Sequence, residues 1–439
     1  MLNHYHVIRR DGRLWIREES YDPAFEAKTE SLFAQVNGRI GIRACFGLPS
    51  LYGKRETFYA GLFGRAFPED VTELANCPDL TAFRLKISGK DLSPDSPYLE
   101  AFQREFSPET GELFICQDFR LPDGGLLRVK EHRFVSYAET ELFLQEITLE
   151  MKEGSAAGAE LVFAANGQVN NEGVSLFRKV ECRVYERTVL GLEAQLPDRL
   201  LSAMCLNRVE EGSTNPPVFT LRRRRVEESR RFDLAEGKTL RLVRFCSYRT
   251  AASVGAEQEA QRKELLSSAE KGFGGLLAEH LSAMDELCRK SSLKITGADP
   301  EIETVLSLSR YHLLGTLPWN REDCGIASKG LTGEGYKGHV FWDTDLFIQP
   351  FFTWFFPEQS RHMLGFRVRG LSGAREKAED YGYRGAMYPW EAAADGCEET
   401  PPFAALDIHT GKAMPVWSGR KEHHVGADIA YALDRKSVV

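Results

Sequence analysis

The chain has 439 residues, a net charge of −8 at pH 7, 42% hydrophobic residues and 27% charged residues. That composition is typical of an ordinary globular protein with two or three domains. The acidic balance disfavours nucleic-acid binding, because a negative surface repels a phosphate backbone. No run of about 18 apolar residues predicts a membrane span, and the polar residues 1–21 contain no signal-peptide pattern.

The nine cysteines are odd in number, and no two of them have CxxC spacing. Neither a disulfide framework nor a zinc site is therefore predicted. Free thiols in a reducing compartment fit this usage better, and we expect a cytoplasmic protein. The run of four arginines at 222–225 lies in a segment that reads as β and is followed by two glutamates, so we interpret it as a solvated strand face.

Residues 1–255 are predicted to form a β-sandwich domain. Short alternating apolar segments recur at 113–116, 142–144 and 240–245, and turn signals such as Asn37-Gly38 separate them. Many short strands with regular turns are typical of a sandwich or a barrel.

Residues 256–295 are predicted to form a helical linker. Residues 257–266 are rich in helix-forming types. Further on, Leu277, Leu281, Met284 and Cys288 recur at the spacing of one helix face.

Residues 296–433 are predicted to be mainly helical, with about four helices. Asp299 and Pro300 form an N-cap followed by a first-turn proline. We expect Ile302, Val305, Leu306, Ser309 and Leu313 to share one face of the first helix. Another helix is expected from 357 towards 380, a long loop at 382–421, and a last helix from about 422.

The stretch 330–345 holds the richest candidate chemistry. Its glycines allow a backbone to approach a ligand closely, and Lys337, His339, Trp342 and Asp343 lie among them. Aromatic rings stack on the apolar faces of a sugar, while carboxylates accept hydrogen bonds from its hydroxyls. Trp390 and Glu391 repeat this combination on a later loop. A glycine-rich structural turn is the alternative interpretation of this spacing.

These segments resemble glycoside hydrolase family 65, which comprises maltose, kojibiose, nigerose and trehalose phosphorylases. The signature-like stretch is KGLTGEGYKGHVFWDTD at 329–345, and GYRGAMYPWEAAADGCEETP at 382–401 and EHHVGADIAYA at 422–432 resemble the next two blocks. Near the N-terminus, residues 30–41 and ELANCPD at 73–79 resemble family blocks more loosely.

The resemblance implies an N-terminal β-sandwich of the super-sandwich type, a helical linker and the first part of an (α/α)6 barrel. It implies that inorganic phosphate cleaves an α-glucosyl disaccharide with inversion, giving β-glucose 1-phosphate and a free sugar. No metal or other cofactor is then needed. The implied partners are the disaccharide and phosphate, and the full-length parent is expected to be a homodimer.

The same resemblance assigns substrate binding to two aromatic–carboxylate pairs. Trp342 with Asp343 and Trp390 with Glu391 match residues around the glucose unit, and Lys337 and His339 are further binding candidates. The family's general acid, a glutamate in a Gly-Pro-Asp-Glu-like block, does not occur in this sequence and is expected downstream of residue 439. Residues 434–439 match nothing in the family and are interpreted as a spurious tail.

We therefore expect a truncated phosphorylase that is inactive alone. One alternative is a hydrolase of the same family that acts on an α-glucoside such as trehalose. Another is a non-catalytic carbohydrate-binding fragment. A requirement for phosphate separates phosphorolysis from hydrolysis, and the signature at 329–345 argues against a pure binding module.

Overall fold

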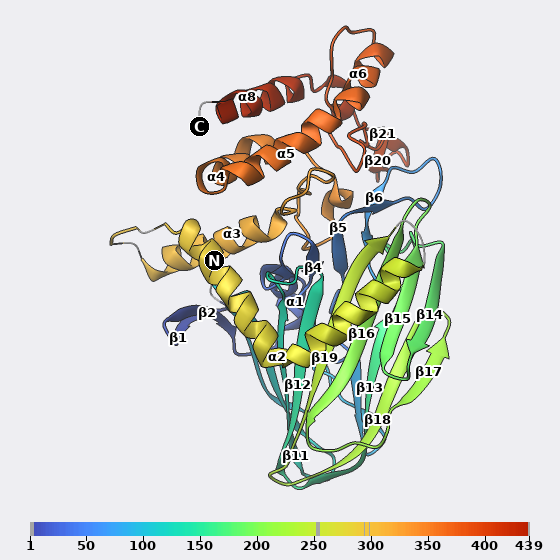
Figure 1. Ribbon diagram of the computed structural model, residues 1–439, viewed down its shortest axis with the longest axis vertical. Helices are drawn as coiled ribbons and strands as arrows, with labels where there is room; N and C mark the ends of the chain where they lie inside the picture. Colours follow the sequence, from blue (N-terminus) through green and yellow to red (C-terminus); the bar gives the residue numbers. More distant parts are fainter. Residues whose placement is uncertain (1–3, 252–254, 294, 298, 438–439) are drawn as a thin grey trace. The chain divides into compact units, whose positions relative to one another are not determined.

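The computed structural model describes residues 4–251, 255–293, 295–297 and 299–437 (Figure 1). A β-rich N-terminal region is followed by a helical region, as predicted. By its internal contacts the chain divides into two compact units. Unit 1 consists of Met1–Thr57, Cys77–Val169 and Phe177–His312, and unit 2 consists of Phe58–Asn76, Asn170–Leu176 and Leu313–Val439.

Unit 1 is built on two antiparallel sheets. Within the described residues the larger sheet comprises, in spatial order, β1 (His6–Arg10), β2 (Arg13–Glu18), β9 (Leu99–Phe106), β10 (Leu113–Arg120), β11 (Leu126–Val135), β12 (Leu142–Glu153), β19 (Thr239–Ala251), β16 (Leu200–Glu211), β15 (Val189–Gln195) and β14 (Lys179–Tyr185). The smaller sheet comprises β17 (Val218–Arg222), β18 (Arg225–Ala235), β13 (Ser155–Asn166), β7 (Phe83–Ile87) and β8 (Lys90–Asp91).

Alternating apolar residues of both sheets form one core. Phe83 and Leu161 of the smaller sheet belong to the same buried cluster as Val129 and Leu149 of the larger one. Side chains of a strand point alternately to its two faces, so this pattern buries one face of each sheet. The predicted strands at 113–116, 142–144 and 240–245 are confirmed as parts of β10, β12 and β19.

The arginine run spans a hairpin, with Arg223 and Arg224 in its turn. β17 ends at Arg222 and β18 begins at Arg225, and these two residues pair across the hairpin. Arg224 has a φ of 57°, a left-handed conformation that tight hairpin turns require. The prediction of a strand is therefore confirmed for Arg222 and Arg225 and wrong for Arg223 and Arg224.

Helix α2 (Ala256–Lys290) covers part of the larger sheet, along β19 and β16 (Figure 1). It is kinked at Gly272, whose φ of 71° is not helical. The predicted apolar face is displaced by about one position: Leu276, His280 and Met284 are buried, while Leu277 and Leu281 are only half-buried. The remaining elements of unit 1 include α1 (Pro23–Leu32) and the paired strands β3 (Gln35–Val36) and β4 (Ile40–Ile42).

Helix α3 (Pro300–Thr316) begins as predicted, because the Asp299 carboxylate accepts from the backbone N–H of Glu301 at 2.8 Å. Its predicted apolar face was wrong. Ile302 and Val305 are exposed, whereas Tyr311 is buried. The Tyr311 hydroxyl accepts from the N–H of Val36 at 3.0 Å, so a polar contact orients this helix.

Unit 2 combines helices with short extended segments. Its described elements are β5 (Thr57–Gly64, all but its first residue), β6 (Glu73–Asn76), η1 (Gly335–Gly338), η2 (Thr344–Ile348), α4 (Gln349–Phe355), α5 (Pro357–Arg369), α6 (Leu371–Asp380), β20 (Phe403–Leu406), β21 (Ala413–Pro415), α7 (Ser418–Lys421) and α8 (Val425–Ser437). The single helix predicted from 357 to 380 is two helices that meet at Gly370. Helix α5 packs against both α4 and α8 (Figure 1).

Two predictions concern the end of the chain and its domain limits. Residues 434–437 continue helix α8, and residues 438–439 lie outside the described residues. The domain limits at 255, 295 and 433 stay predictions. The contact units differ from them chiefly because residues 58–76 and 170–176 belong to the helical unit.

Candidate functional site

Two segments carrying the predicted aromatic–carboxylate pairs are joined by backbone hydrogen bonds in unit 2. The N–H of Val340 donates to the carbonyl of Ala392 at 2.8 Å, and the N–H of Ala392 donates back at 3.0 Å. Trp342 follows Val340 by two residues, and Trp390 precedes Ala392 by two. This small bridge therefore brings together residues about 50 positions apart in the sequence.

The rings of these two tryptophans form a half-buried, angled pair. Their centroids lie 6.3 Å apart with an interplanar angle of 49°. His424 presents its edge to both rings, at 4.9 Å from Trp342 and 5.9 Å from Trp390. All three sequence blocks that resemble the family thus contribute a ring to one aromatic cluster, which we call the indole cluster (Trp342, Trp390 and His424).

The two aspartates of the signature have different surroundings. Asp345 is buried and forms an ion pair with Arg367 at 2.7 Å, and Arg367 also donates to the carbonyl of Phe341 at 2.9 Å. Asp343 is exposed, and its carboxylate has no hydrogen-bond partner among the described residues. Partial burial nevertheless raises the pKa of Asp343 above its usual 3.8. Asp345 is thus committed to the fold, while Asp343 is available to a ligand.

Glu391 is anchored through one of its two carboxylate oxygens. Its Oε2 lies 2.7 Å from Nδ1 of His339, whose side chain is fully buried. The other ring nitrogen of His339, Nε2, lies 2.6 Å from the carbonyl oxygen of Thr72. The second carboxylate oxygen of Glu391 has no partner among the described residues.

Glu398 fixes the backbone that carries Trp390 and Glu391. Its carboxylate accepts from the N–H of Trp390 at 3.1 Å and from that of Glu391 at 3.2 Å. It also pairs with Lys377, whose side chain is only 5% exposed. Hydrogen bonds to a charged acceptor are stronger than those between neutral groups, so this carboxylate holds the segment in one position.

The glycine-rich turn of the signature packs closely against β6. Tyr336, Lys337 and Gly338 all have φ between 55° and 71°, a left-handed run that is costly for the two non-glycine residues. A Cβ on Gly338 would lie 2.3 Å from the Cβ of Leu74. The Lys337 ammonium pairs with the carboxylate of Glu73 on the same strand, so a glycine is needed where the two segments meet.

Thr72, Glu73 and Glu398 were not among the residues predicted for the site. Thr72 and Glu73 are separated from their partners by more than 260 positions. A signal existed for Glu73, since it opens the block at 73–79 that resembles the family. Nothing in that block identified a contact with the signature.

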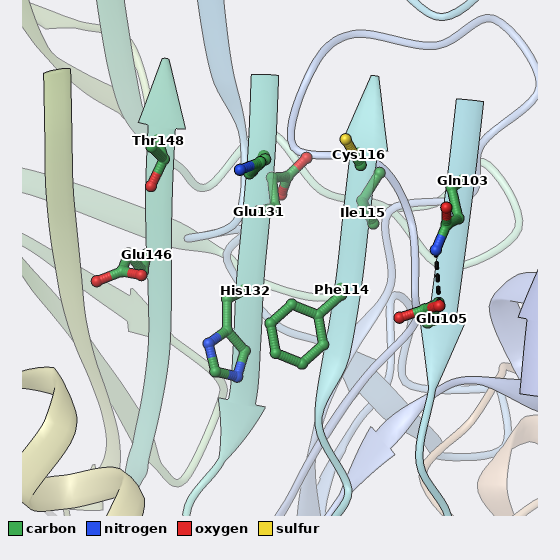
Figure 2. A pocket seen from close by; sticks show the side chains of 10 residues that line it. Gln103, Glu105, Phe114, Ile115, Cys116, Glu131, His132, Glu146 and Thr148 are labelled. Carbon is green, nitrogen blue, oxygen red and sulfur yellow. Dashed lines mark hydrogen bonds between the residues drawn. The ribbon is translucent and has the colours of Figure 1, made fainter. Parts of the chain in front are cut away.

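A hollow of about 230 Å³ lies on the larger sheet of unit 1 (Figure 2). It is lined by Gln103, Glu105, Phe114, Ile115, Cys116, Lys130, Glu131, His132, Glu146 and Thr148. Its charged groups are already paired: Glu105 accepts from Arg10 at 2.8 Å, and Lys130 donates to Glu150 at 2.5 Å. Paired charges give an incoming ligand fewer free acceptors than the indole cluster and its carboxylates do.

Residues 4–251, 255–293, 295–297 and 299–437 contain no group of three or more His, Cys, Asp or Glu side chains placed to hold a metal ion. Across the same part of the chain, no helix combines the length and apolarity needed to cross a membrane.

Two regions of the chain match models of one protein family. Residues 16–287 match the glycosyl hydrolase family 65 N-terminal domain. Residues 307–437 match the glycosyl hydrolase family 65 central catalytic domain. The chain belongs to glycosyl hydrolase family 65. The resemblance predicted from the signature and its two following blocks is therefore confirmed.

Several curated relatives of this family 65 chain are named as phosphorylases. It is 31% identical to the kojibiose phosphorylase of Halothermothrix orenii, over 98% of this chain and 56% of the relative. It is 32% identical to the kojibiose phosphorylase of Escherichia coli (92% and 54%) and 25% identical to the α,α-trehalose phosphorylase of Thermoanaerobacter brockii (96% and 56%). The chain spans about half the length of these relatives.

A solved structure supports the fold. The chain superposes with a TM-score of 0.82 on a structure described as "Putative kojibiose phosphorylase from human microbiome", covering 99% of this chain and 57% of that one. The sequence identity over this match is 18%, so the likeness shows the fold alone.

Proposed function

We propose that unit 2 carries the glucose-binding wall of a disaccharide phosphorylase. The observation that carries this proposal is the combination of the indole cluster with Asp343, a carboxylate that the fold leaves unpaired. Ligand sites are largely apolar and hold a few well-placed polar groups. Two angled indoles offer apolar faces to a pyranose ring, and the carboxylates of Asp343 and Glu391 accept from its hydroxyls. Lys337 pairs with Glu73, and His339 contacts Glu391.

The reaction that we propose is inverting phosphorolysis of an α-glucosyl disaccharide. Inorganic phosphate attacks the anomeric carbon, the glycosidic bond breaks, a general acid protonates the leaving oxygen, and β-glucose 1-phosphate forms. The family membership and the names of the relatives support this reaction class. The general acid expected downstream of residue 439, the super-sandwich, the incomplete (α/α)6 barrel and the homodimer stay predictions.

Glucose binding to this chain tests the proposal directly. Replacing Asp343 by asparagine removes a charged acceptor, whose hydrogen bond is worth about 1.5–3 kcal/mol, so glucose affinity should fall about 10- to 150-fold. The titration is followed by intrinsic tryptophan fluorescence, to which Trp342 and Trp390 contribute. Asp380→Asn, an exposed carboxylate at the end of α6, is the matched control and should leave the affinity unchanged.

The pH dependence of the same titration has a defined sign. Only ionised Asp343 is a full acceptor, and partial burial raises its pKa above 3.8. Glucose affinity should therefore decrease as the pH falls towards 4, and this acid limb should be absent from Asp343→Asn. Equal affinities of wild type and Asp343→Asn at pH 7 would rule out the proposed role of this carboxylate.

The requirement for phosphate separates phosphorolysis from hydrolysis. With kojibiose or α,α-trehalose as substrate, a protein that carries this chain and the expected general acid should consume the disaccharide only when inorganic phosphate is present, and should form β-glucose 1-phosphate and free glucose. Phosphate-independent release of glucose would instead favour the hydrolase alternative.

A further inference from the structure

The two ring nitrogens of His339 each take part in a hydrogen bond that needs a proton. A neutral histidine beside an ionised carboxylate supplies only one of these two protons. A backbone carbonyl only accepts, so Nε2 must donate to the oxygen of Thr72, 2.6 Å away. Nδ1 and Oε2 of Glu391 are 2.7 Å apart, a separation typical of a hydrogen bond with a proton between the two atoms. A neutral imidazole has only one N–H. The second proton therefore belongs either to His339, as an imidazolium, or to Glu391, as a carboxylic acid.

The chemistry of the two groups favours the imidazolium, since an imidazole is a stronger base than a carboxylate. Besides the carboxylate of Glu391, three others lie near this pair in the described residues. Glu73 directly follows Thr72 in the sequence, Glu398 accepts from the N–H of Glu391, and Glu399 accepts from the N–H of Thr72. Three cations pair with the last three, namely Lys337, Lys377 and Arg65. Glu391 is the carboxylate left without a cation, so an imidazolium at His339 pairs with it, whereas a neutral His339 requires Glu391 to be a carboxylic acid. A buried ion pair is stable only when its remaining groups are hydrogen-bonded, and both nitrogens of His339 are.

We propose that His339 is a positioning residue for the sugar. This role rests on the function proposed above. The imidazolium holds Glu391 ionised and fixes Oε2, which leaves Oε1 as an oriented acceptor for one hydroxyl of the glucosyl unit. His339 is fully buried and both its ring nitrogens are occupied, so it acts through Glu391. Loss of its proton would place the Nδ1 lone pair against a carboxylate oxygen and would release Glu391 from this orientation.

His280 of unit 1 provides an internal control. It is also fully buried, and its Nε2 also lies 2.6 Å from a backbone carbonyl, that of Thr110. Its Nδ1, however, accepts from the N–H of Tyr137 at 3.2 Å, so a neutral ring satisfies both contacts. Burial lowers the pKa of His280 to about 4. The two histidines share their burial and their Nε2 anchor and differ at Nδ1.

Nitrogen NMR of the ¹⁵N-histidine-labelled chain reads the proton positions directly. At pH 7 we expect two N–H groups on His339 and one on His280. The conservative variant Glu391→Gln should shift the His339 signals alone and thereby assign them without removing either ring. A neutral His339 in a single tautomer would overturn the proposal, because Glu391 would then hold the proton.

Glucose titrations test the consequence for binding. His339→Gln should bind glucose about tenfold more weakly at pH 7, the loss expected for one charge-assisted hydrogen bond. His280→Gln should keep the wild-type affinity. An unchanged glucose affinity in His339→Gln would overturn the proposal.

The two proposals fail in different ways. If the wild-type chain binds no glucose at any pH, the proposed function fails, while the NMR experiment still decides the charge of His339. If glucose binds but His339 is neutral, only the positioning role fails.

Discussion

His280 and His339 show how one buried side-chain type serves two purposes. Each is fully buried and donates from Nε2 to a carbonyl oxygen at 2.6 Å. In unit 1 the second nitrogen faces a backbone N–H, and in unit 2 it faces the carboxylate of Glu391. The first histidine completes the fold as a neutral ring, and the second connects the fold to a side chain of the site.

The signature aspartates repeat this contrast two residues apart. Asp345 is satisfied by Arg367, while Asp343 has no partner among the residues that the structure describes. A polar group that the fold fully satisfies stabilises it, and one that the fold leaves unsatisfied is available for binding. The following variants test that division, beginning with the largest expected effect.

Asp345→Asn should lower the free energy of unfolding by about 3–5 kcal/mol, because it leaves the buried Arg367 guanidinium without its counter-charge. Urea unfolding followed by circular dichroism measures the loss. Asp343→Asn is the matched control and should stay within about 0.5 kcal/mol of wild type. Similar losses in both variants would remove the distinction between the two aspartates.

His280 should make the fold less stable in acid. The pKa of His280 is about 4 in the folded chain and 6.5 in the unfolded chain. Between these pH values the unfolded chain therefore binds a proton that the folded chain does not. Stability is therefore lost as the pH falls from 6.5 to 4, by about 3 kcal/mol. Glutamine does not titrate. The stability difference between wild type and His280→Gln should accordingly shrink by this amount between pH 7 and pH 4, and a constant difference would contradict a neutral His280.

Gly338→Ala should cost about 2 kcal/mol, because the added methyl group would lie 2.3 Å from the Cβ of Leu74 at a φ of 71°. Gly382→Ala is the control, since its φ is 76° but no atom lies within 4 Å of an added Cβ. It should lose only about 1 kcal/mol. Because Gly338 precedes His339, the first substitution should also disturb the His339 NMR signals. Equal losses would show that backbone strain, rather than the contact with β6, explains the glycine.

The sequence predicted element types better than it predicted which faces are buried. The N-cap at Asp299 identified the start of α3, since capping depends on neighbouring residues. The apolar stripe chosen for that helix missed Tyr311, whose hydroxyl bonds to the backbone at Val36. A count of apolar positions does not recognise an aromatic residue that is buried through its polar tip.

The candidate site was predicted in the same uneven way. Trp342, Trp390 and their carboxylates were predicted because they lie in long blocks that resemble the family. The partners of Lys337 and His339 were missed, since Glu73 and Thr72 lie in the β-rich half of the sequence. Contacts across more than 260 residues leave no periodic signal in one sequence.

The membership of residues 58–76 and 170–176 in unit 2 has a consequence for how the chain folds during synthesis. The carbonyl of Thr72 leaves the ribosome 267 residues before its partner His339. Contacts between positions so far apart form slowly, because a long loop must close first. Unit 2 therefore cannot be completed as its helices emerge one by one. The strand pair made early in translation must wait for the later helices, and expression of the helical half alone would leave Gly338 and His339 without the surface on which they pack.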